Sequence, residues 1–269
     1  EDGIRDYKVT GVQTCALPIS VHLAPMLSRP VSRRRFAASL AAVGGGLAAP
    51  RAMAAPASNP WAMLAGEAAL WRRYMVERSI PYWIATVDPM GGYALSDDAA
   101  RGRKAPLEKQ LVSQARMVWG LSFAHRHGLC PGGNACIHAA QHGVLYLRSR
   151  MKDFVHGGYY FAVQPDGGPR DPRKLVYGQA FAIYALVEWF RASGDRSALS
   201  DAMELFHLLH FRAHDHVHHG WTEHFERDWT PLPRHAPDAI VEVAGLKSAN
   251  THLHLLEAFT ELYRETHDS

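Results

Sequence analysis

The sequence predicts an all-α protein built from repeated helix pairs, and three observations support this fold class. Apolar residues recur with the 3.6-residue period of a helix over most of the chain after residue 60. A glycine followed by an aromatic residue recurs between these segments, as Gly92-Tyr93, Gly158-Tyr159 and Gly220-Trp221. No segment with the two-residue period of a strand is long enough to build a central sheet.

Six segments carry the helical pattern. In the first, residues 61–78, one face collects the residues Trp61, Leu64, Ala68, Trp71 and Met75. The other five segments span residues 107–126, 134–152, 175–192, 198–213 and 245–265.

The spacing of the glycines connects these helices into a repeat. Gly92, Gly158 and Gly220 are 66 and 62 residues apart, and a fixed period of this size indicates a repeated helix-pair unit. Glycine permits a positive φ at a tight turn, and we expect the aromatic residue to cap the core. One pair cannot bury its apolar face alone, so neighbouring pairs must stack.

The first 54 residues are not expected to belong to this domain. Residues 1–20 have no continuing period, and GVQTCALPIS resembles translated sequencing-adapter sequence, with a natural disordered N-terminus as the alternative. Residues 21–54 resemble a twin-arginine signal peptide: three arginines at 33–35, a 13-residue apolar run and Ala52-Met53-Ala54 as cleavage site. We therefore expect a periplasmic or secreted protein whose domain spans residues 55–269.

That domain is expected to be about the first half of a closed double ring of helices. Its roughly 215 residues hold three to three and a half units of the observed period, whereas a closed ring needs about six. The sequence also ends just after a strongly helical segment, without a capping unit.

Composition and cysteine usage limit the partners. The net charge is only +3, and no basic stripe is interleaved with aromatic residues, so nucleic-acid binding is not expected. The 13-residue apolar run is too short to span a ~30 Å bilayer core, so no membrane partner is expected after cleavage. Cys130 and Cys136 are predicted to be two separate buried thiols, with a disulfide as the alternative.

Several polar residues stand within apolar patterns and are candidates for a site. Arg116 lies in an otherwise apolar helix, so it is either paired in a salt bridge or faces a polar cavity. Lys174, Tyr177 and Phe181 are expected to share a helical face, so that Tyr177 points where Lys174 points, with core packing as the alternative.

Two histidine-containing stretches are also candidates. Asn250, His254 and Glu257 are expected to crowd together on one helical face. A tract from His214 to His219 suggests metal binding, but no well-spaced tetrahedral set completes it, so we predict a solvated loop and no metal site.

Four stretches together resemble the N-acylglucosamine 2-epimerase superfamily, which includes cellobiose 2-epimerases and mannose isomerases. They are ARMVW at 115–119, HGGYY at 156–160, KLVYGQAFAIYALVE at 174–188 and KSANTHLHLLEA at 247–258. The resemblance covers roughly residues 61–264. It implies an (α/α)6 barrel (toroid) with its pocket at one end of the inner helix ring, and proton transfer without metal or nucleotide at C2 of a reducing mono- or disaccharide, through an enediolate.

The resemblance also implies roles for single residues. Arg116 matches the catalytic arginine that contacts the sugar oxygens near the reacting carbon, and His254 matches the histidine that binds the sugar hydroxyls. Tyr177 and Asn250 match substrate-binding residues of the pocket. The two acid/base histidines of the family lie beyond the last residue of this sequence, so we expect the chain alone to be inactive.

The sequence is also compatible with two other functions. A glycoside hydrolase or lyase on the same architecture would need two carboxylates flanking the bond, and Asp166, Glu223 and Glu226 are available in loops. A non-catalytic carbohydrate-binding protein is the second alternative, because fold alone does not distinguish these functions.

Overall fold

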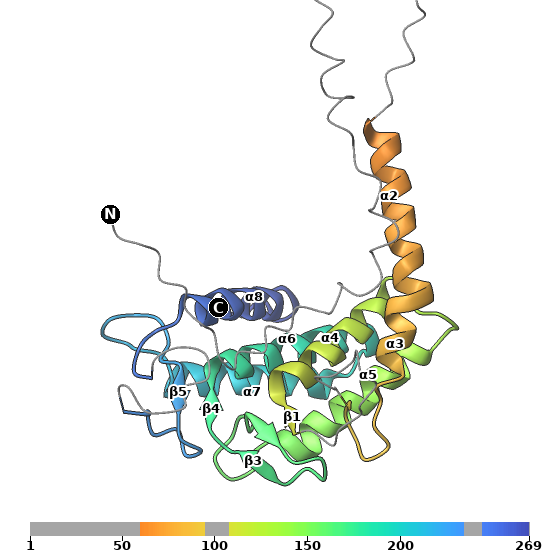
Figure 1. Cartoon of the computed structure of the whole chain (residues 1–269). Coiled ribbons are helices and arrows are strands. Elements are labelled where there is room, and N and C mark those ends of the chain that lie inside the picture. The colour runs from red at the N-terminus through yellow and green to blue at the C-terminus, as the bar shows by residue number, and fades with distance from the viewer. Residues whose placement is uncertain (1–59, 95–107, 234–243, 269) are drawn as a thin grey trace, which may run out of the picture. The chain divides into compact units, whose positions relative to one another are not determined.

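The computed structural model describes residues 60–94, 108–233 and 244–268 (Figure 1). The predicted leader (1–20) and the predicted signal peptide (21–54) lie outside the described residues. Two compact units are present, residues 1–68 and 69–269, and the first is described only through the start of helix α2. None of the described helices is both long and apolar enough to cross a lipid bilayer.

The helices of the structure confirm the predicted helical segments, with ends that differ by a few residues. The helices are α2 (Pro60–Tyr74), α3 (Ile80–Ile84), α4 (Leu111–Arg126), α5 (Ala135–Tyr146), α6 (Val176–Ser193), α7 (Arg196–Arg212) and α8 (Ala249–Thr266). π-Helical turns follow α2 at Met75–Ser79 and α5 at Leu147–Met151.

Helices α4, α6 and α8 lie side by side as an inner layer, while α5 packs on α4 and α7 packs on α6 as an outer layer (Figure 1). Helix α6 has neighbours on three sides, and accordingly Ala182, Ile183 and Leu186 are fully buried. Most of the free energy that stabilises these helices comes from this burial of apolar faces rather than from helix propensity.

Short strands tie down the loops that precede the inner helices. Strands β1 (Lys109–Gln110), β2 (Ala162–Val163) and β3 (Pro169–Asp171) form one antiparallel sheet, and β4 (Lys174–Leu175) pairs with β5 (His224–Phe225). The pairing of β1 explains why α4 begins at Leu111 rather than at the predicted residue 107, since Lys109 and Gln110 are extended.

The predicted repeat is confirmed by the three glycine-aromatic turns, which are built alike. Gly92, Gly158 and Gly220 all have positive φ, at 65°, 67° and 79°. The aromatic residue after each glycine bridges to the end of the preceding outer segment, in the pairs Val87↔Tyr93, Lys152↔Tyr159 and His214↔Trp221.

Each turn is joined to the following inner helix by three polar residues, which we call a clasp. The first clasp is Asp88, Lys109 and Gln114; the second is Asp153, Lys174 and Gln179; the third is Asp215, Lys247 and His252. In each, the lysine ammonium pairs with the aspartate, at 2.8, 2.9 and 2.7 Å. The third member accepts the backbone N–H of the aromatic residue, at 2.8, 2.9 and 3.0 Å. The clasps therefore fix the register of α4, α6 and α8 against their turns.

Two expectations are corrected. Lys174 does not share a helical face with Tyr177, because α6 begins only at Val176 and Lys174 lies in β4, fully buried against Asp153. Cys130 and Cys136 are not separate thiols but form a disulfide, with Cα atoms 5.8 Å apart, inside the range that a disulfide requires. The intervening turn closes because Gly132 and its neighbour Gly133 both adopt positive φ.

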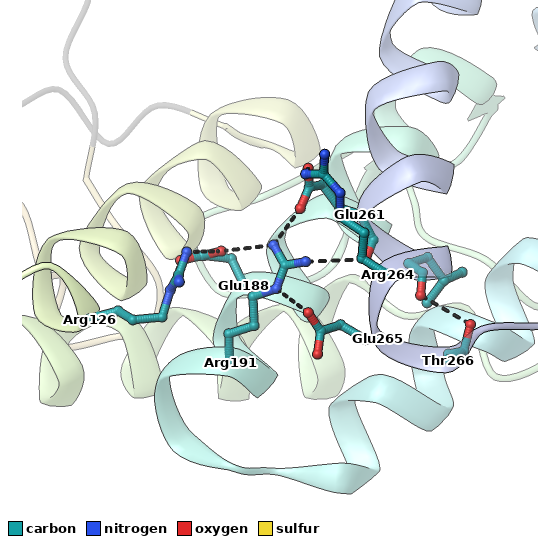
Figure 2. A network of polar contacts seen from close by, with 8 residues as sticks. Arg126, Glu188, Arg191, Glu261, Arg264, Glu265 and Thr266 are labelled. Carbon is teal, nitrogen blue, oxygen red and sulfur yellow. Dashed lines mark hydrogen bonds and ion pairs between the residues drawn. The ribbon is translucent and has the colours of Figure 1, made fainter.

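The C-terminal halves of the inner helices are joined by charged side chains (Figure 2). Arg126 of α4 pairs with the buried Glu188 of α6 at 2.8 Å, and Arg191 of α6 pairs with Glu265 of α8 at 2.6 Å and also with Glu261. Basic residues near a helix C-terminus are favoured by the helix dipole. The network holds the three inner helices together at the ends opposite to those that carry the candidate site.

Candidate active site

The predicted site residues gather near the N-terminal ends of the inner helices. Arg116, Phe181 and His254 are each the sixth residue of their helix and lie two positions after the clasp residue of that helix. Tyr177 and Asn250 lie one helical turn earlier, in α6 and α8. Because the clasps repeat, equivalent positions of three helices meet at one place.

Phe181 is the centre of this cluster. The guanidinium of Arg116 lies 4.4 Å from the centroid of its ring, within cation–π distance. The ring of His254 lies 4.6 Å from the Phe181 ring, and the ring of Tyr177 lies 5.1 Å from it. Tyr177 and His254 also contact each other edge to face at 5.2 Å. Phe181 itself is only 6% exposed, so it acts as a buried platform for the polar groups around it.

The polar groups on this platform remain accessible. Arg116 is exposed, Tyr177 is half-buried, and the side chain of His254 is 18% exposed. Among the described residues no carboxylate forms an ion pair with Arg116, so the structure does not support the salt-bridge alternative for it. A cation without a counter-ion on a packed platform is suited to binding an anionic or strongly polar ligand group.

The third inner helix carries its candidate residues on one face, as predicted. The Nδ1 atom of His254 lies 2.8 Å from an oxygen of Glu257, and Asn250 is exposed one turn before His254. Sequence reasoning named Phe181 only as sharing a face with Tyr177 and Glu257 only as a neighbour of His254, and it gave neither residue a role of its own. The register of the repeat could have located both residues. Phe181 is seven residues after the clasp lysine Lys174, and Glu257 is ten residues after the clasp lysine Lys247.

Comparison with known proteins decides the family. The model of the N-acylglucosamine 2-epimerase (GlcNAc 2-epimerase) family matches residues 91–269. The chain belongs to this family. A cellobiose 2-epimerase of Ruminococcus albus is 33% identical over 199 residues, which are 72% of this chain and 48% of that protein. A D-mannose isomerase of Thermobifida fusca is 27% identical over 204 residues, 74% of this chain and 44% of that protein.

The solved structures confirm the fold. The cellobiose 2-epimerase from Spirochaeta thermophila superposes with a TM-score of 0.69 at 35% identity, covering 79% of this chain and 52% of that one. The layered helix pairs α4 to α8 are thus part of the predicted (α/α)6 barrel. The chain spans about half the length of the relatives that it matches.

Two of the carboxylates available to a hydrolase, Glu223 and Asp166, are engaged in contacts that hold the backbone. Glu223 is fully buried and accepts hydrogen bonds from the backbone N–H of Tyr177, at 3.1 Å, and from the hydroxyl of Thr251. It therefore joins the first turns of α6 and α8. Asp166 accepts the backbone N–H of Gly168 at 2.9 Å, which stabilises its own turn. These contacts assign structural rather than hydrolytic roles to both residues in this member of the epimerase family.

The histidine tract lies in the loop after α7 and makes none of the contacts with Phe181 that form the cluster. His214 and His216 face each other with their Nδ1 atoms 3.1 Å apart, and the exposed His218 lies 3.3 Å from Asp215. Within residues 60–94, 108–233 and 244–268, no group of three or more His, Cys, Asp or Glu side chains is arranged to hold a metal ion.

Proposed function

We propose that this chain carries the sugar-recognising half of an epimerase or isomerase that moves a proton at C2 of a reducing mono- or disaccharide. The observation that carries the proposal is the meeting of Arg116, Tyr177 and His254 on the Phe181 platform. Membership of the N-acylglucosamine 2-epimerase family supports it.

Arg116 is assigned to the charge that develops during the reaction. Removal of the C2 proton leaves an enediolate, whose negative charge rests on the oxygens at C1 and C2. A fixed cation near those oxygens lowers the barrier, because it is already oriented before the charge develops. The partial positive charge at the N-terminal ends of α4, α6 and α8 acts in the same direction.

His254, Tyr177 and Asn250 are assigned to the hydroxyls of the sugar. An imidazole, a phenol and an amide together supply both donors and acceptors, which matches the two-way hydrogen bonding of a hydroxyl. The proposed reaction needs no redox cofactor, because no electrons leave the substrate. None of these residues is assigned to the proton transfer itself.

Because the family resemblance places the acid/base histidines beyond residue 269, the test uses the product of the gene extended at its 3′ end to a stop codon. C2 proton exchange in D2O is followed by NMR with cellobiose, D-mannose and N-acetylglucosamine. Arg116→Met is expected to slow exchange at least about 100-fold, the usual cost of losing one group that stabilises an oxyanion. Arg212→Met is the matched control, because Arg212 also lies over a phenylalanine ring, at 5.3 Å, but on the outer helix α7. An extended wild-type protein that folds but exchanges no sugar proton would overturn the proposal.

We also propose that the chain is exported by a twin-arginine route. The arginines at 33–35, the apolar run and the Ala52-Met53-Ala54 site follow the order of such a signal. A reporter fused after residue 60 is expected in the periplasm, and replacement of the three arginines by lysine is expected to retain it in the cytoplasm. A reporter that stays cytoplasmic with the native arginines would refute export.

A further inference from the structure

His254 is constrained on three sides by neighbours of different chemistry. The Phe181 ring lies against it at 4.6 Å, the Tyr177 ring meets it edge to face at 5.2 Å, and an oxygen of Glu257 lies 2.8 Å from Nδ1. The first two contacts restrict where the imidazole lies. The third determines which of its nitrogens carries the proton.

A carboxylate can only accept a hydrogen bond, so the nitrogen that faces it must be the one that bears hydrogen. With Nδ1 protonated, a neutral imidazole has its lone pair on Nε2. Among the described residues, none forms a hydrogen bond with Nε2 of His254. That atom is therefore the acceptor that remains for a ligand.

We propose that Glu257 is a positioning residue, which holds His254 in the Nδ1-protonated form so that Nε2 accepts a hydrogen bond from a sugar hydroxyl. This inference rests on the proposed function, because the ligand is the sugar of that same site. The chemical consequence is a preference for a ligand group that donates a hydrogen bond at this position, such as a hydroxyl, over one that only accepts, such as an ether oxygen.

The ordinary alternative is that the pair is an incidental contact between residues three apart on a helix surface. The repeat argues against it. The positions equivalent to Glu257 in the other inner helices are Trp119 and Tyr184, whose rings stack on each other at 5.1 Å. Of the three inner helices that the structure describes, only α8 places a carboxylate at this position, and only α8 places a histidine at the position of Arg116 and Phe181.

Glu257 also lies near Tyr184 of the neighbouring helix α6. Burial raises the pKa of Tyr184 on α6, and the nearby carboxylate of Glu257 raises that pKa further, followed by the carboxylate of Glu261. Glu257 is thus close enough to α6 to act on its groups, although half of its own side chain is exposed.

The tautomer can be measured directly. The chain is labelled with ¹⁵N-histidine and studied by NMR at a pH where imidazoles are neutral. A protonated and an unprotonated ring nitrogen then have distinct chemical shifts. The His254 signals are assigned by their loss in the variant His254→Gln. We expect Nδ1–H in the wild type and in Glu257→Gln, which keeps an acceptor. Glu257→Met removes the acceptor and is expected to move His254 toward the Nε2–H form.

Glu204→Met is the matched control, because Glu204 is an exposed helical glutamate with its own ion pair, to Lys152 on the outer layer at 3.1 Å. It is expected to leave the His254 signals unchanged. A wild-type His254 protonated at Nε2, or signals that do not respond to Glu257→Met, would overturn the inference.

Titration with cellobiose and D-mannose completes the test. Glu257→Met is expected to weaken sugar binding about fivefold, the usual effect of losing one well-oriented hydrogen bond, with Glu257→Gln closer to the wild type. If the wild type binds sugar but the tautomer is independent of Glu257, this inference alone fails. If the tautomer depends on Glu257 but the wild type binds no sugar, the proposed function fails and the role in sugar binding fails with it.

Discussion

The third clasp differs from the first two in the residue that accepts the backbone N–H of the aromatic residue in the turn. Gln114 and Gln179 each accept the aromatic N–H and donate back to the carbonyl of the same residue, at 3.0 and 2.8 Å. His252 accepts the N–H of Trp221 through Nε2, but its Nδ1 lies 2.7 Å from the carbonyl oxygen of Ser248, in its own helix start. His252 therefore makes one hydrogen bond with the aromatic residue of its turn, whereas Gln114 and Gln179 each make two.

The ion pairs of the clasps differ in the same direction. The Lys174 and Asp153 side chains of the second clasp are 0% exposed, whereas the Lys247 and Asp215 side chains of the third are 32% and 26% exposed. Each clasp sets the register of its inner helix, and the third sets that of α8, which carries His254. Among the described residues the same clasp thus occurs three times. The copy with the most exposed ion pair also uses a histidine as its acceptor, and that histidine lies two residues before the candidate sugar-binding residue His254.

The largest difference in the free energy of unfolding is expected between variants of two clasp lysines, Lys174 and Lys247. Burial alone would raise the pKa of Asp153, but hydrogen bonds from Arg227 and Lys174 hold that pKa well below its ordinary value. Lys174→Met leaves the buried carboxylate with one partner fewer, which is expected to cost about 3 kcal/mol. Lys247→Met, at an exposed pair, is expected to cost under about 1 kcal/mol. Urea unfolding measures both.

The double variant Asp153→Asn/Lys174→Met is the control for the buried charge. It removes the carboxylate together with the ammonium, so it is expected to recover part of the loss of Lys174→Met. Equal losses of stability for Lys174→Met and Lys247→Met would show that the difference in burial between the two clasps does not affect stability.

A smaller difference in stability is expected between variants of Gln179 and His252, which accept the backbone N–H of the aromatic residues. Gln179→Leu leaves the N–H and the carbonyl of the buried Tyr159 without their partner, which is expected to cost about 2–4 kcal/mol. His252→Leu deprives the N–H of Trp221 of its acceptor and takes Nδ1 from the Ser248 carbonyl, which keeps the backbone N–H of residue 252, at an expected cost of about 1–2 kcal/mol. Thermal unfolding at neutral pH compares them. A larger loss for His252→Leu would contradict the view that the third clasp is the weaker.

Sensitivity to acid is expected to arise after the third turn, at His224 of β5. Burial lowers the pKa of His224 to about 4, with the charge of Arg173 adding to the effect, and neither ring nitrogen has a hydrogen-bond partner among the described residues. The unfolded value is about 6.5, so the unfolded chain binds the proton first. The stability that neutral His224 contributes is therefore complete above about pH 6.5 and is lost as the pH falls toward 4, by about 2 kcal/mol at pH 5.

His224→Leu is expected to remove this acid loss. The position equivalent to His224 in the second repeat is Ala162 of β2, four residues after the glycine, so an apolar side chain is compatible with the strand. The melting temperature followed from pH 7.5 to pH 4 tests this. Parallel curves for wild type and variant would assign the acid sensitivity to other groups.

The smallest effect is expected from His252→Gln, which converts the third clasp to the chemistry of the first two. Near pH 7.5 its stability is expected to lie within about 0.5 kcal/mol of the wild type. A glutamine can accept the N–H of Trp221 as His252 does, and it can also donate to the Trp221 carbonyl as Gln114 and Gln179 donate in their own turns. Urea unfolding measures this, and a loss above about 2 kcal/mol would show that glutamine cannot take the place of His252 in this clasp.

Much of the architecture could be read from local sequence. The helical period located α4 to α8 because each helix has one apolar face against the core, and the glycine-aromatic pairs marked the turns because only glycine fits their positive φ at low cost. The motifs around Arg116 and His254 indicated the family, which the comparisons confirmed. Their roles as sugar-binding residues remain predictions.

Other features depended on contacts between residues far apart in the chain. Periodicity placed Lys174 with Tyr177, but the start of α6 at Val176 and the partner Asp153, 21 residues earlier, sent the lysine into the interior. The disulfide between Cys130 and Cys136 depended likewise on how the turn between them closes, which two glycines with positive φ allow.

The sequence by itself determined which segments are helices, where the chain turns, and which polar residues stand out from apolar faces, because these properties depend on neighbours within a few residues. Only the tertiary structure decided that Arg116, Phe181 and His254 meet, whereas the nearness of Glu257 to His254, three residues apart on one helix, could be read from the sequence. The physical reason is that the clasps set the register of three helices against one another. That register depends on hydrogen bonds and ion pairs between residues about 20 to 30 positions apart, which no local pattern contains.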